Sequence, residues 1–231
     1  MSLKLGVPSK GRLMEQCFEW FRDRGIGLKR AGAEREYAGL VTGIENVEMV
    51  LLSAGEIPRE LASGRIHLGV TGTDLVREKL GQSDTTVTAV QELGFGHADL
   101  VLAVPQAWVD VSTLDDLDAV AAAFRQTHGF RLRIATKYHR LVRDFLRRAG
   151  IADYQLVDSQ GATEGTVKNE TAEAIADITS TGASLRDNHL KVLEDGLILQ
   201  SQATLFQSNN LAAEPALEMT LKSVLARISS G

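Results

Sequence analysis

The sequence predicts an α/β protein of two lobes, each built around a parallel sheet. In both halves of the 231 residues, short apolar runs typical of strands alternate with segments of helical periodicity. A glycine-bearing stretch, residues 91–96, separates the halves, and the sequence contains no short-period repeat or low-complexity segment. Because two-lobed proteins usually hold a ligand in the cleft between the lobes, we expect a binding site there.

The first half opens with a strand, a basic loop and a helix. Residues 3–7 are apolar enough for a strand, and Pro-Ser-Lys-Gly-Arg at 8–12 forms the loop that follows. Apolar side chains then recur at helical spacing from Leu13, and the helix stops at Gly25. The other elements expected in this half are short strands within 26–46, a strand at 47–52, a helix at 56–62, a strand at 66–70, a Thr-Gly-Thr-Asp loop at 71–74 and a helix that ends at Leu80.

The second half shows the same alternation. Strands are expected at 100–104, 132–135, 154–157 and 174–178, with one or two more within 190–206. Helices are expected at 114–124, from 141 to Gly150, at 166–173 and at 217–228. Ser112 and Asp115 predict a capping box at the start of the first of these helices, with Asp in place of the usual Glu.

Composition and charge exclude several classes of function. The chain is 44% hydrophobic and 24% charged, as expected of a soluble globular enzyme. Its net charge of −5 argues against a duplex nucleic acid as partner, although cations gather between residues 131 and 148. No run approaches the roughly 18 apolar residues that cross a bilayer, and the N-terminus lacks the pattern of a signal peptide. The one cysteine, Cys17, lies among apolar residues at helical spacing, which predicts core packing in a reducing cytoplasm.

One segment indicates a binding site for a sugar phosphate. A short apolar strand reaches Asp177, and Ser-Thr-Gly-Ala-Ser follows at 180–184. Gly182 permits a tight turn, so that N–H groups and hydroxyls can converge on a phosphate. Asp177 would repel a phosphate, but its carboxylate can accept hydrogen bonds from a ribose diol. The alternative is a strand-ending turn capped by Ser and Thr side chains.

Two loops of the first half are further candidates. Lys10, Gly11 and Arg12 lie between a strand and a helix N-terminus, where open α/β sheets hold anionic ligands. The alternative is a surface turn with solvated cations. Thr73 or Asp74 is a suitable N-cap for the helix that follows, and the same loop can also face a ligand.

Several motifs resemble, in order, those of the ATP phosphoribosyltransferases that open histidine biosynthesis. They are Pro-Ser-Lys-Gly-Arg-Leu at 8–13, Glu-Ile-Pro at 56–58, Leu-Gly-Val-Thr-Gly-Thr-Asp-Leu at 68–75, Arg-Ile-Ala-Thr-Lys-Tyr at 133–138, and Glu-Ala-Ile-Ala-Asp at 173–177 followed by Ser-Thr-Gly-Ala-Ser-Leu at 180–185. The last pair is the most specific. One such motif is a weak signal, but the ordered set spans almost the whole chain.

The resemblance implies a fold and a reaction. The fold is that of type II periplasmic binding proteins, with the active site in the interlobe cleft. Lobe I would comprise residues 1–93 and 186–231, and lobe II residues 94–185 with the ribose-5-phosphate loop. In the reaction, N1 of ATP attacks C1′ of phosphoribosyl pyrophosphate, and pyrophosphate chelated by Mg²⁺ leaves as N1-(5-phosphoribosyl)-ATP forms. Because adenine N1 is unprotonated at neutral pH, we expect positioning and charge to supply the rate, without a strong base or a covalent nucleophile.

The resemblance also assigns residues to the two substrates. Asp177 would hold the ribose hydroxyls, and Glu164 falls at a family position that faces the same site. The residues around the 5-phosphate would be Ser180, Thr181, Gly182, Ala183 and Ser184. The ATP and pyrophosphate side would be lined by Lys10, Gly11, Arg12 and Thr73, and the catalytic cations would be Lys10, Arg12 and Arg35.

The chain departs from the family at one cation. Many members carry an arginine near the end of the strand that precedes the Asp/Glu-Ile-Pro motif, but this chain has no cation in that region, residues 51–56 around Ser53. The role of that arginine would fall to Lys10, Arg12, Arg35 or the metal. The alternative for Arg35 is a surface role.

The chain resembles the short form of the family, which lacks a C-terminal regulatory domain. Short forms work with a catalytically inactive subunit that looks like a histidyl-tRNA synthetase. The resemblance therefore implies a homodimer within a hetero-oligomer, with histidine feedback through the partner. Two other functions stay open: a two-lobed small-molecule binding protein without catalysis, and another phosphoribosyltransferase with a different nucleophile. Against the binding protein stand the absence of an export signal and the 177–184 segment.

Overall fold

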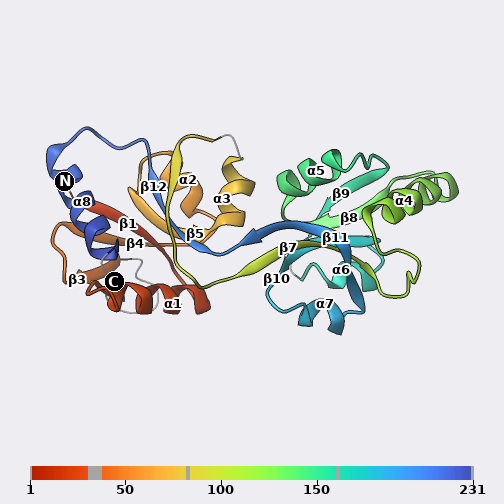
Figure 1. Cartoon of the computed structure of the whole chain (residues 1–231), viewed down its shortest axis with the longest axis horizontal. Coiled ribbons are helices and arrows are strands. Elements are labelled where there is room, and N and C mark those ends of the chain that lie inside the picture. Colours follow the sequence, from red (N-terminus) through yellow and green to blue (C-terminus); the bar gives the residue numbers. More distant parts are fainter. Residues whose placement is uncertain (1, 31–37, 82–83, 160–161, 230–231) are drawn as a thin grey trace. The chain divides into compact units, whose positions relative to one another are not determined.

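The chain forms two compact units, shown in Figure 1 as a computed structural model that describes residues 2–30, 38–81, 84–159 and 162–229. The first unit comprises Met1–Gly96 and Gln202–Gly231, and the second comprises His97–Ser201. The second boundary therefore differs from the expected one at 185/186. The reason is that strand β11, Leu190–Ser201, pairs antiparallel with β7, Ala98–Pro105, and so belongs to the second unit.

The first unit contains a sheet whose described strands follow the order β2-β3-β4-β1-β5-β12-β6. The strands are β1 Leu3–Pro8, β2 Gly27–Arg30, β3 Ala38–Thr42, β4 Val47–Leu52, β5 Leu68–Gly72, β6 Val87–Glu92 and β12 Ala203–Ser208. β1 pairs in parallel with β4 and β5, but β12 runs antiparallel to β5 and β6, and β3 antiparallel to β2 and β4. The prediction of a parallel sheet is thus correct only for its centre. The C-terminal strand β12 inserts in the opposite direction, and β6 occupies part of the stretch expected as linker.

Helices cover both faces of this sheet. On one face lie α1, Gly11–Arg22, and α8, Pro215–Ser229, whose buried side chains share a core with β1, β5 and β12. On the other face, α2, Ile57–Ala62, and α3, Thr73–Leu80, pack with Phe206 of β12. Cys17 is fully buried in the first of these cores, as predicted, and burial raises the pKa of its thiol.

The second unit contains a mixed sheet in the order β11-β7-β10-β8-β9. The remaining strands are β8 Leu132–Thr136, β9 Tyr154–Asp158 and β10 Ala174–Thr179. β8 pairs in parallel with β9 and β10, whereas β7 is antiparallel to β10 and β11. The expected parallel arrangement therefore holds for β9, β8 and β10 alone.

Four helices are described in this unit, two on each side of the sheet (Figure 1). One side carries α4, Leu114–His128, and α5, His139–Arg148. The other carries α6, Gly165–Lys168, and α7, Ala183–Asp187. The helix expected at 166–173 is shorter because Glu170 adopts a positive φ of 55° just after it. In the described parts of the chain, no helix has the length and hydropathy to cross a membrane.

The capping box of α4 is shifted by one residue from the predicted pair. Thr113 is the N-cap, and its Oγ1 accepts a hydrogen bond from the Asp116 N–H at 3.3 Å. The Asp116 carboxylate accepts in return from the Thr113 N–H at 2.9 Å. Both pairs, Ser112–Asp115 and Thr113–Asp116, have the required spacing, so the sequence pattern alone does not choose between them.

Candidate functional site

Asp177 stands near the carboxyl end of β10, a strand inside the second sheet. Side chains alternate along a strand, so Asp177 shares a face with buried Ile175, which packs with Val167 of α6 and Leu185 of α7. Its Oδ1 accepts a hydrogen bond from the Ile178 N–H at 2.8 Å. An ionised carboxylate has about four acceptor sites, so this half-buried group keeps capacity for two ligand hydroxyls.

The turn after β10 is held by its own threonines. Gly182 has φ +71°, and its N–H donates to Thr179 Oγ1 at 2.8 Å. The Ala183 N–H donates to Thr181 Oγ1 at 3.3 Å. The tight turn is therefore confirmed, but these two N–H groups bond threonine hydroxyls, which differs from the expected row of N–H groups aimed at a ligand. Because both threonine oxygens accept, their O–H hydrogens stay available to a phosphate.

Glu164 and Ser184 meet although they lie on different elements. Glu164 is the N-cap residue of α6, and its Oε1 accepts a hydrogen bond from the Ser184 hydroxyl on α7. This hydrogen bond is the main cause that lowers the pKa of Glu164, and the charge of Lys137 lowers it further. Lys137 follows β8, next to β10, and is a residue that the site prediction left out. Its position in the 133–138 motif was the available signal.

The remaining hydroxyl of the turn is tied to the start of the second unit. Ser180 donates to the His97 carbonyl at 3.0 Å, so its O–H must rotate before it can donate to a phosphate. Two further residues support the turn from behind: Arg186 donates to the Thr181 carbonyl at 3.1 Å, and the Asn188 amide donates to the Ser184 carbonyl at 2.9 Å. Sequence reasoning missed both, because their roles depend on backbone carbonyls that no motif spacing reveals.

The other candidate residues lie at the carboxyl edge of the first sheet. Lys10 is the N-cap of α1, and Gly11 begins that helix with φ +73°. Lys10 and Arg12 are exposed, and neither forms an ion pair within the described residues. The Ser9 N–H donates to the Leu52 carbonyl at 2.7 Å, which joins the ends of β1 and β4. Arg30 donates from Nη2 to the Ser9 carbonyl and so braces this basic loop.

Thr73, predicted to face a ligand, forms hydrogen bonds within the protein instead. Its N–H donates to the Gln202 carbonyl at 3.2 Å, and its hydroxyl lies 3.2 Å from the Thr204 hydroxyl. Thr73 is the first residue of α3, whose N-cap is Gly72 with no side-chain cap, so the predicted capping by Thr73 or Asp74 is wrong. The loop does follow β5, beside β1, and the basic loop and Thr73 therefore belong to neighbouring parallel strands.

The region without the family arginine has its own hydrogen bonds. Ser53 donates to Glu56 Oε2 from its hydroxyl at 2.6 Å and from its N–H at 3.0 Å. These bonds hold the pKa of Glu56 below its usual value. Arg35, the proposed substitute, lies outside the described residues.

A metal held only by protein is not supported by the donors present. Among the residues that the structure describes, no three His, Cys, Asp or Glu side chains cluster closely enough to hold a metal ion. Asp177 and Glu164 are carboxylates of the kind that Mg²⁺ accepts, but Mg²⁺ usually keeps several waters and binds one or two carboxylates together with substrate phosphates.

Comparison with known proteins points to one family. The family model described as "HisG: ATP phosphoribosyltransferase" matches residues 53–230 of this chain. An ATP phosphoribosyltransferase of Cereibacter sphaeroides is 71% identical over 208 residues, which are 90% of this chain and 88% of that protein. One of Mesorhizobium japonicum is 48% identical over 229 residues, which are 99% of this chain and 98% of that protein.

Solved structures share the fold. The ATP phosphoribosyl transferase (HisG:HisZ) complex from Thermotoga maritima has a TM-score of 0.74 at 20% identity and covers 99% of this chain and 96% of that chain. The GluR0 ligand-binding core in complex with L-glutamate has a TM-score of 0.51 at 13% identity, with 100% and 93% covered. A substrate-binding protein of an amino acid ABC transporter gives the same TM-score at 12% identity, with 100% and 94% covered. The expected likeness to periplasmic binding proteins is thereby confirmed as a likeness of fold.

Proposed function

This chain belongs to the HisG family of ATP phosphoribosyltransferases, which catalyse the first step of histidine biosynthesis, and we propose from this premise how its residues perform the transfer. The second unit binds phosphoribosyl pyrophosphate, and the first unit supplies the cations on the ATP and pyrophosphate side. One observation carries the proposal: Asp177, Glu164 and the 180–184 turn gather on the face of the second sheet that α6 and α7 cover.

Asp177 holds the ribose. Its carboxylate accepts hydrogen bonds from the 2- and 3-hydroxyls and fixes C1′ relative to the attacking nitrogen. Charge-assisted hydrogen bonds of this kind are shorter and stronger than neutral ones. The Lys137 charge lowers the pKa of Glu164 and so favours its ionised form, and this second carboxylate stabilises the positive charge that builds on the ribose as the C1′–O bond breaks.

The 180–184 turn holds the 5-phosphate. Thr181 and Thr179 use their hydroxyls as acceptors inside the turn, so their hydrogens can be donated to phosphate oxygens. Ser180 and Ser184 join them after rotating away from His97 and Glu164. Gly182 and Ala183 have small or no side chains, so the 5-phosphate can approach the backbone of the turn closely.

Lys10 and Arg12 stabilise the negative charge on departing pyrophosphate. Both are exposed at the carboxyl edge of the first sheet, and Gly11 between them keeps the loop free of a side chain. Mg²⁺ carried by pyrophosphate neutralises part of the same charge. Thr73 lines this side through its backbone loop, since its hydroxyl is engaged with Thr204. No base is needed because adenine N1 already has a free lone pair.

We further propose that the chain acts as the short form of the family, as a homodimer within a hetero-oligomer. The Thermotoga structure described as a HisG:HisZ complex supports this arrangement by analogy. The partner would be a regulatory subunit that looks like a histidyl-tRNA synthetase. The buried free thiol of Cys17 suits a reducing compartment, so we place the enzyme in the cytoplasm.

Asp177→Asn tests the assignment of the ribose. Loss of a charge-assisted hydrogen bond is worth about 1.5–3 kcal/mol, so kcat/KM for phosphoribosyl pyrophosphate should fall on the order of tenfold to a hundredfold. The measurement is the absorbance of the adenine-N1 adduct formed from ATP, phosphoribosyl pyrophosphate and Mg²⁺, with and without the regulatory subunit.

Asp118→Asn, an exposed change on α4, is the matched control and should keep wild-type kinetics. Wild-type kinetics in Asp177→Asn would make Asp177 a structural residue. Absence of any adduct with the wild-type chain and its partner would refute the proposed reaction itself.

A further inference from the structure

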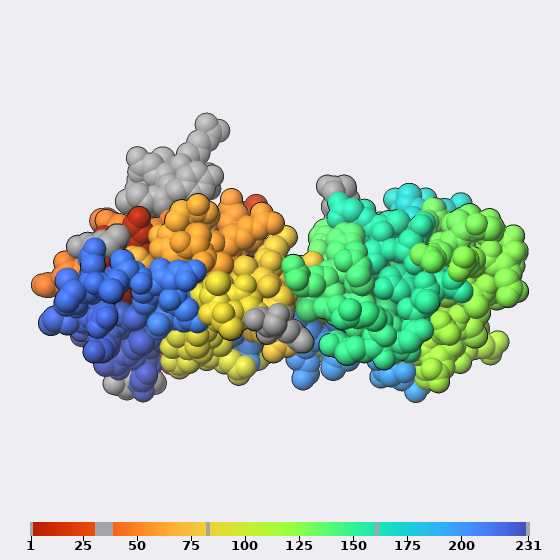
Figure 2. Space-filling view, turned by 90° about the horizontal axis from the view of Figure 1, so that it is seen from above, coloured from red at the N-terminus to blue at the C-terminus, as the bar shows by residue number. Residues whose placement is uncertain are grey.

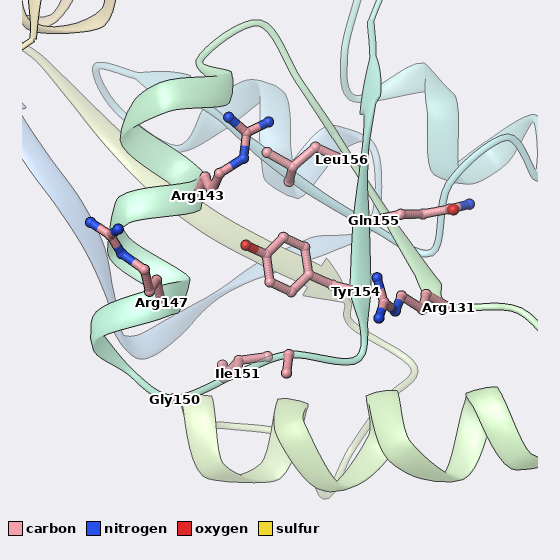
Figure 3. A pocket seen from close by; sticks show the side chains of 9 residues that line it. Arg131, Arg143, Arg147, Gly150, Ile151, Tyr154, Gln155 and Leu156 are labelled. Atoms are coloured by element: carbon pink, nitrogen blue, oxygen red, sulfur yellow. The ribbon is translucent and has the colours of Figure 1, made fainter.

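A hollow of about 530 Å³ opens on the second unit beside α5 and β9. Residues 131–156, green to teal in Figure 2, form part of the surface of this unit. Its polar lining residues come from three places in the unit: Arg131 precedes β8, Arg143 and Arg147 lie on α5, and Tyr154 and Gln155 begin β9. Apolar contacts come from Ile151 and Leu156 (Figure 3).

This hollow is distinct from the proposed phosphoribosyl site. Arg131 comes just before β8 and Lys137 just after it. The two sites therefore lie at opposite ends of this strand, which is five residues or about 16 Å long. They also lie on opposite faces. Val157 packs with the α6 and α7 side, and Tyr154, three residues away on the same strand, points to the α5 side.

Three arginines, Arg131, Arg143 and Arg147, line the hollow in a chain that is acidic overall. Arg143 and Arg147 are one helical turn apart and therefore share a face of α5. In Figure 3 the Tyr154 hydroxyl points toward this helix, between the two arginines. Of the seven Lys or Arg residues in the segment 131–148, three line the hollow, and the segment contains one carboxylate, Asp144, whereas the chain has a net charge of −5.

The cations of the hollow are poorly neutralised by the protein. Arg147 forms an exposed ion pair with Asp144 at 3.0 Å, of the kind that contributes little. Asp153, which precedes Tyr154 in the sequence, pairs with Arg125. Within the described residues, Arg131 and Arg143 take part in no ion pair. Burial raises the pKa of Tyr154, so its hydroxyl keeps its proton and can donate a hydrogen bond.

We propose that this hollow is a second anion site, which binds a small phosphorylated molecule with an uncharged ring. Arginine forks match phosphate oxygens in two-bond geometry, and the Tyr154 hydroxyl adds a fourth donor. Ile151, Leu156 and the Tyr154 ring supply apolar surface for the rest of the ligand. The volume lies within the range of about 300–1,000 Å³ typical of small-molecule pockets, so the hollow has room for such a ligand.

The test uses a local reporter in the full-length chain. The sequence contains three tyrosines, so ring-¹³C-tyrosine labelling gives few NMR signals, and Tyr154→Phe identifies the signal of Tyr154. The probes are inorganic phosphate and guanosine monophosphate. We expect guanosine monophosphate to shift the Tyr154 signal saturably and more tightly than phosphate does. In Arg131→Gln/Arg143→Gln the apparent affinity should fall at least tenfold.

Two comparisons make the result specific. Arg148→Gln removes a cation from α5 that does not line the hollow and should bind as the wild type does. Lys10→Gln/Arg12→Gln removes the proposed catalytic cations and should leave the Tyr154 response in place. The proposal is overturned by a shift that does not saturate, by equal affinity in the Arg131/Arg143 variant, or by loss of the response in the Lys10/Arg12 variant. Binding only to RNA or to a partner protein would overturn it too.

Discussion

Single residues of the 180–184 turn have roles that depend on their particular chemistry. Gly182 is there because its φ of +71° costs an L-residue about 1–2 kcal/mol, and because a Cβ would lie 2.8 Å from Arg186 Nη1. The Arg186 guanidinium in turn holds the Thr181 carbonyl. A side chain at 182 would therefore strain the backbone and also push away the group that braces the turn.

Gly182→Ala should weaken binding of phosphoribosyl pyrophosphate as well as stability. We expect a loss of about 1–2 kcal/mol in the free energy of unfolding and a several-fold rise in KM. Gly129→Ala is the matched control, since Gly129 has φ +75° but a Cβ added there would meet no other group within 4 Å. It should lose similar stability with an unchanged KM. Equal KM values in both variants would contradict a role for Gly182 in the site.

Ser184→Ala should raise the pKa of Glu164. The hydrogen bond from Ser184 is the largest cause of the lowered pKa, and the Lys137 charge stays in the variant. Because the folded-state pKa lies below the ordinary value of 4.5, the hydrogen bond stabilises the fold fully above that pH, and the contribution disappears as pH falls through the lowered pKa. The stability difference between wild type and variant should shrink over that acidic window.

The measurement is a carboxyl-¹³C titration of Glu164, combined with denaturant unfolding at several pH values. Ser180→Ala is the control, because Ser180 donates to a carbonyl and not to a carboxylate. Its Glu164 pKa should equal that of the wild type. The same Glu164 pKa in all three proteins would mean that the Ser184 contact is not formed in solution.

At the scale of elements, the direction of the strands determines which sequence motifs lie close together. Because β8, β9 and β10 are parallel, the residues that follow them lie at the same end of the sheet. Lys137 therefore comes near Glu164. Contacts at the opposite end of these strands help fix their register. The Arg133 N–H donates to Glu173 at 2.7 Å, and the two side chains form an ion pair. The two motifs that contain these residues are thus joined by contacts as well as by sequence order.

Thr113→Ala tests the capping box of α4. Removing a Thr N-cap costs about 1 kcal/mol, since the Asp116 N–H loses its acceptor. Ser112→Ala is the control, because the Ser112 N–H that donates to Asp116 belongs to the backbone and survives the change. It should alter the free energy of unfolding by less than about 0.5 kcal/mol. The reverse order of the two effects, from thermal or urea unfolding, would favour the Ser112–Asp115 box.

At the scale of the whole molecule, the first unit is built from two separate segments of the chain. Residues after Gln202 return to complete the first sheet, with β12 between β5 and β6. The proposed catalytic cations belong to the first unit and the proposed ribose-binding residues to the second, so the proposal assigns the two substrates to different units.

Gel filtration with light scattering tests the proposed assembly. We expect the chain alone to elute as a homodimer, and to enter a larger complex when the histidyl-tRNA-synthetase-like subunit is added. Inhibition of adduct formation by histidine should appear only in the complex. A reconstitution with an unrelated protein of similar size is the control. A stable monomer that is fully active and inhibited by histidine would contradict the prediction.

Local patterns were sufficient for the alternation of strands and helices, the burial of Cys17, the Gly182 turn and the family itself, because periodicity and motif order are properties of neighbouring residues. Only the tertiary structure decided that the sheets are mixed, that β11 belongs to the second unit, that Thr113 is the cap of α4, and that Ser184 bonds Glu164. Each of these depends on atoms far apart in the chain, or on a choice between patterns of equal spacing. Such outcomes follow from packing, which no single stretch of sequence contains.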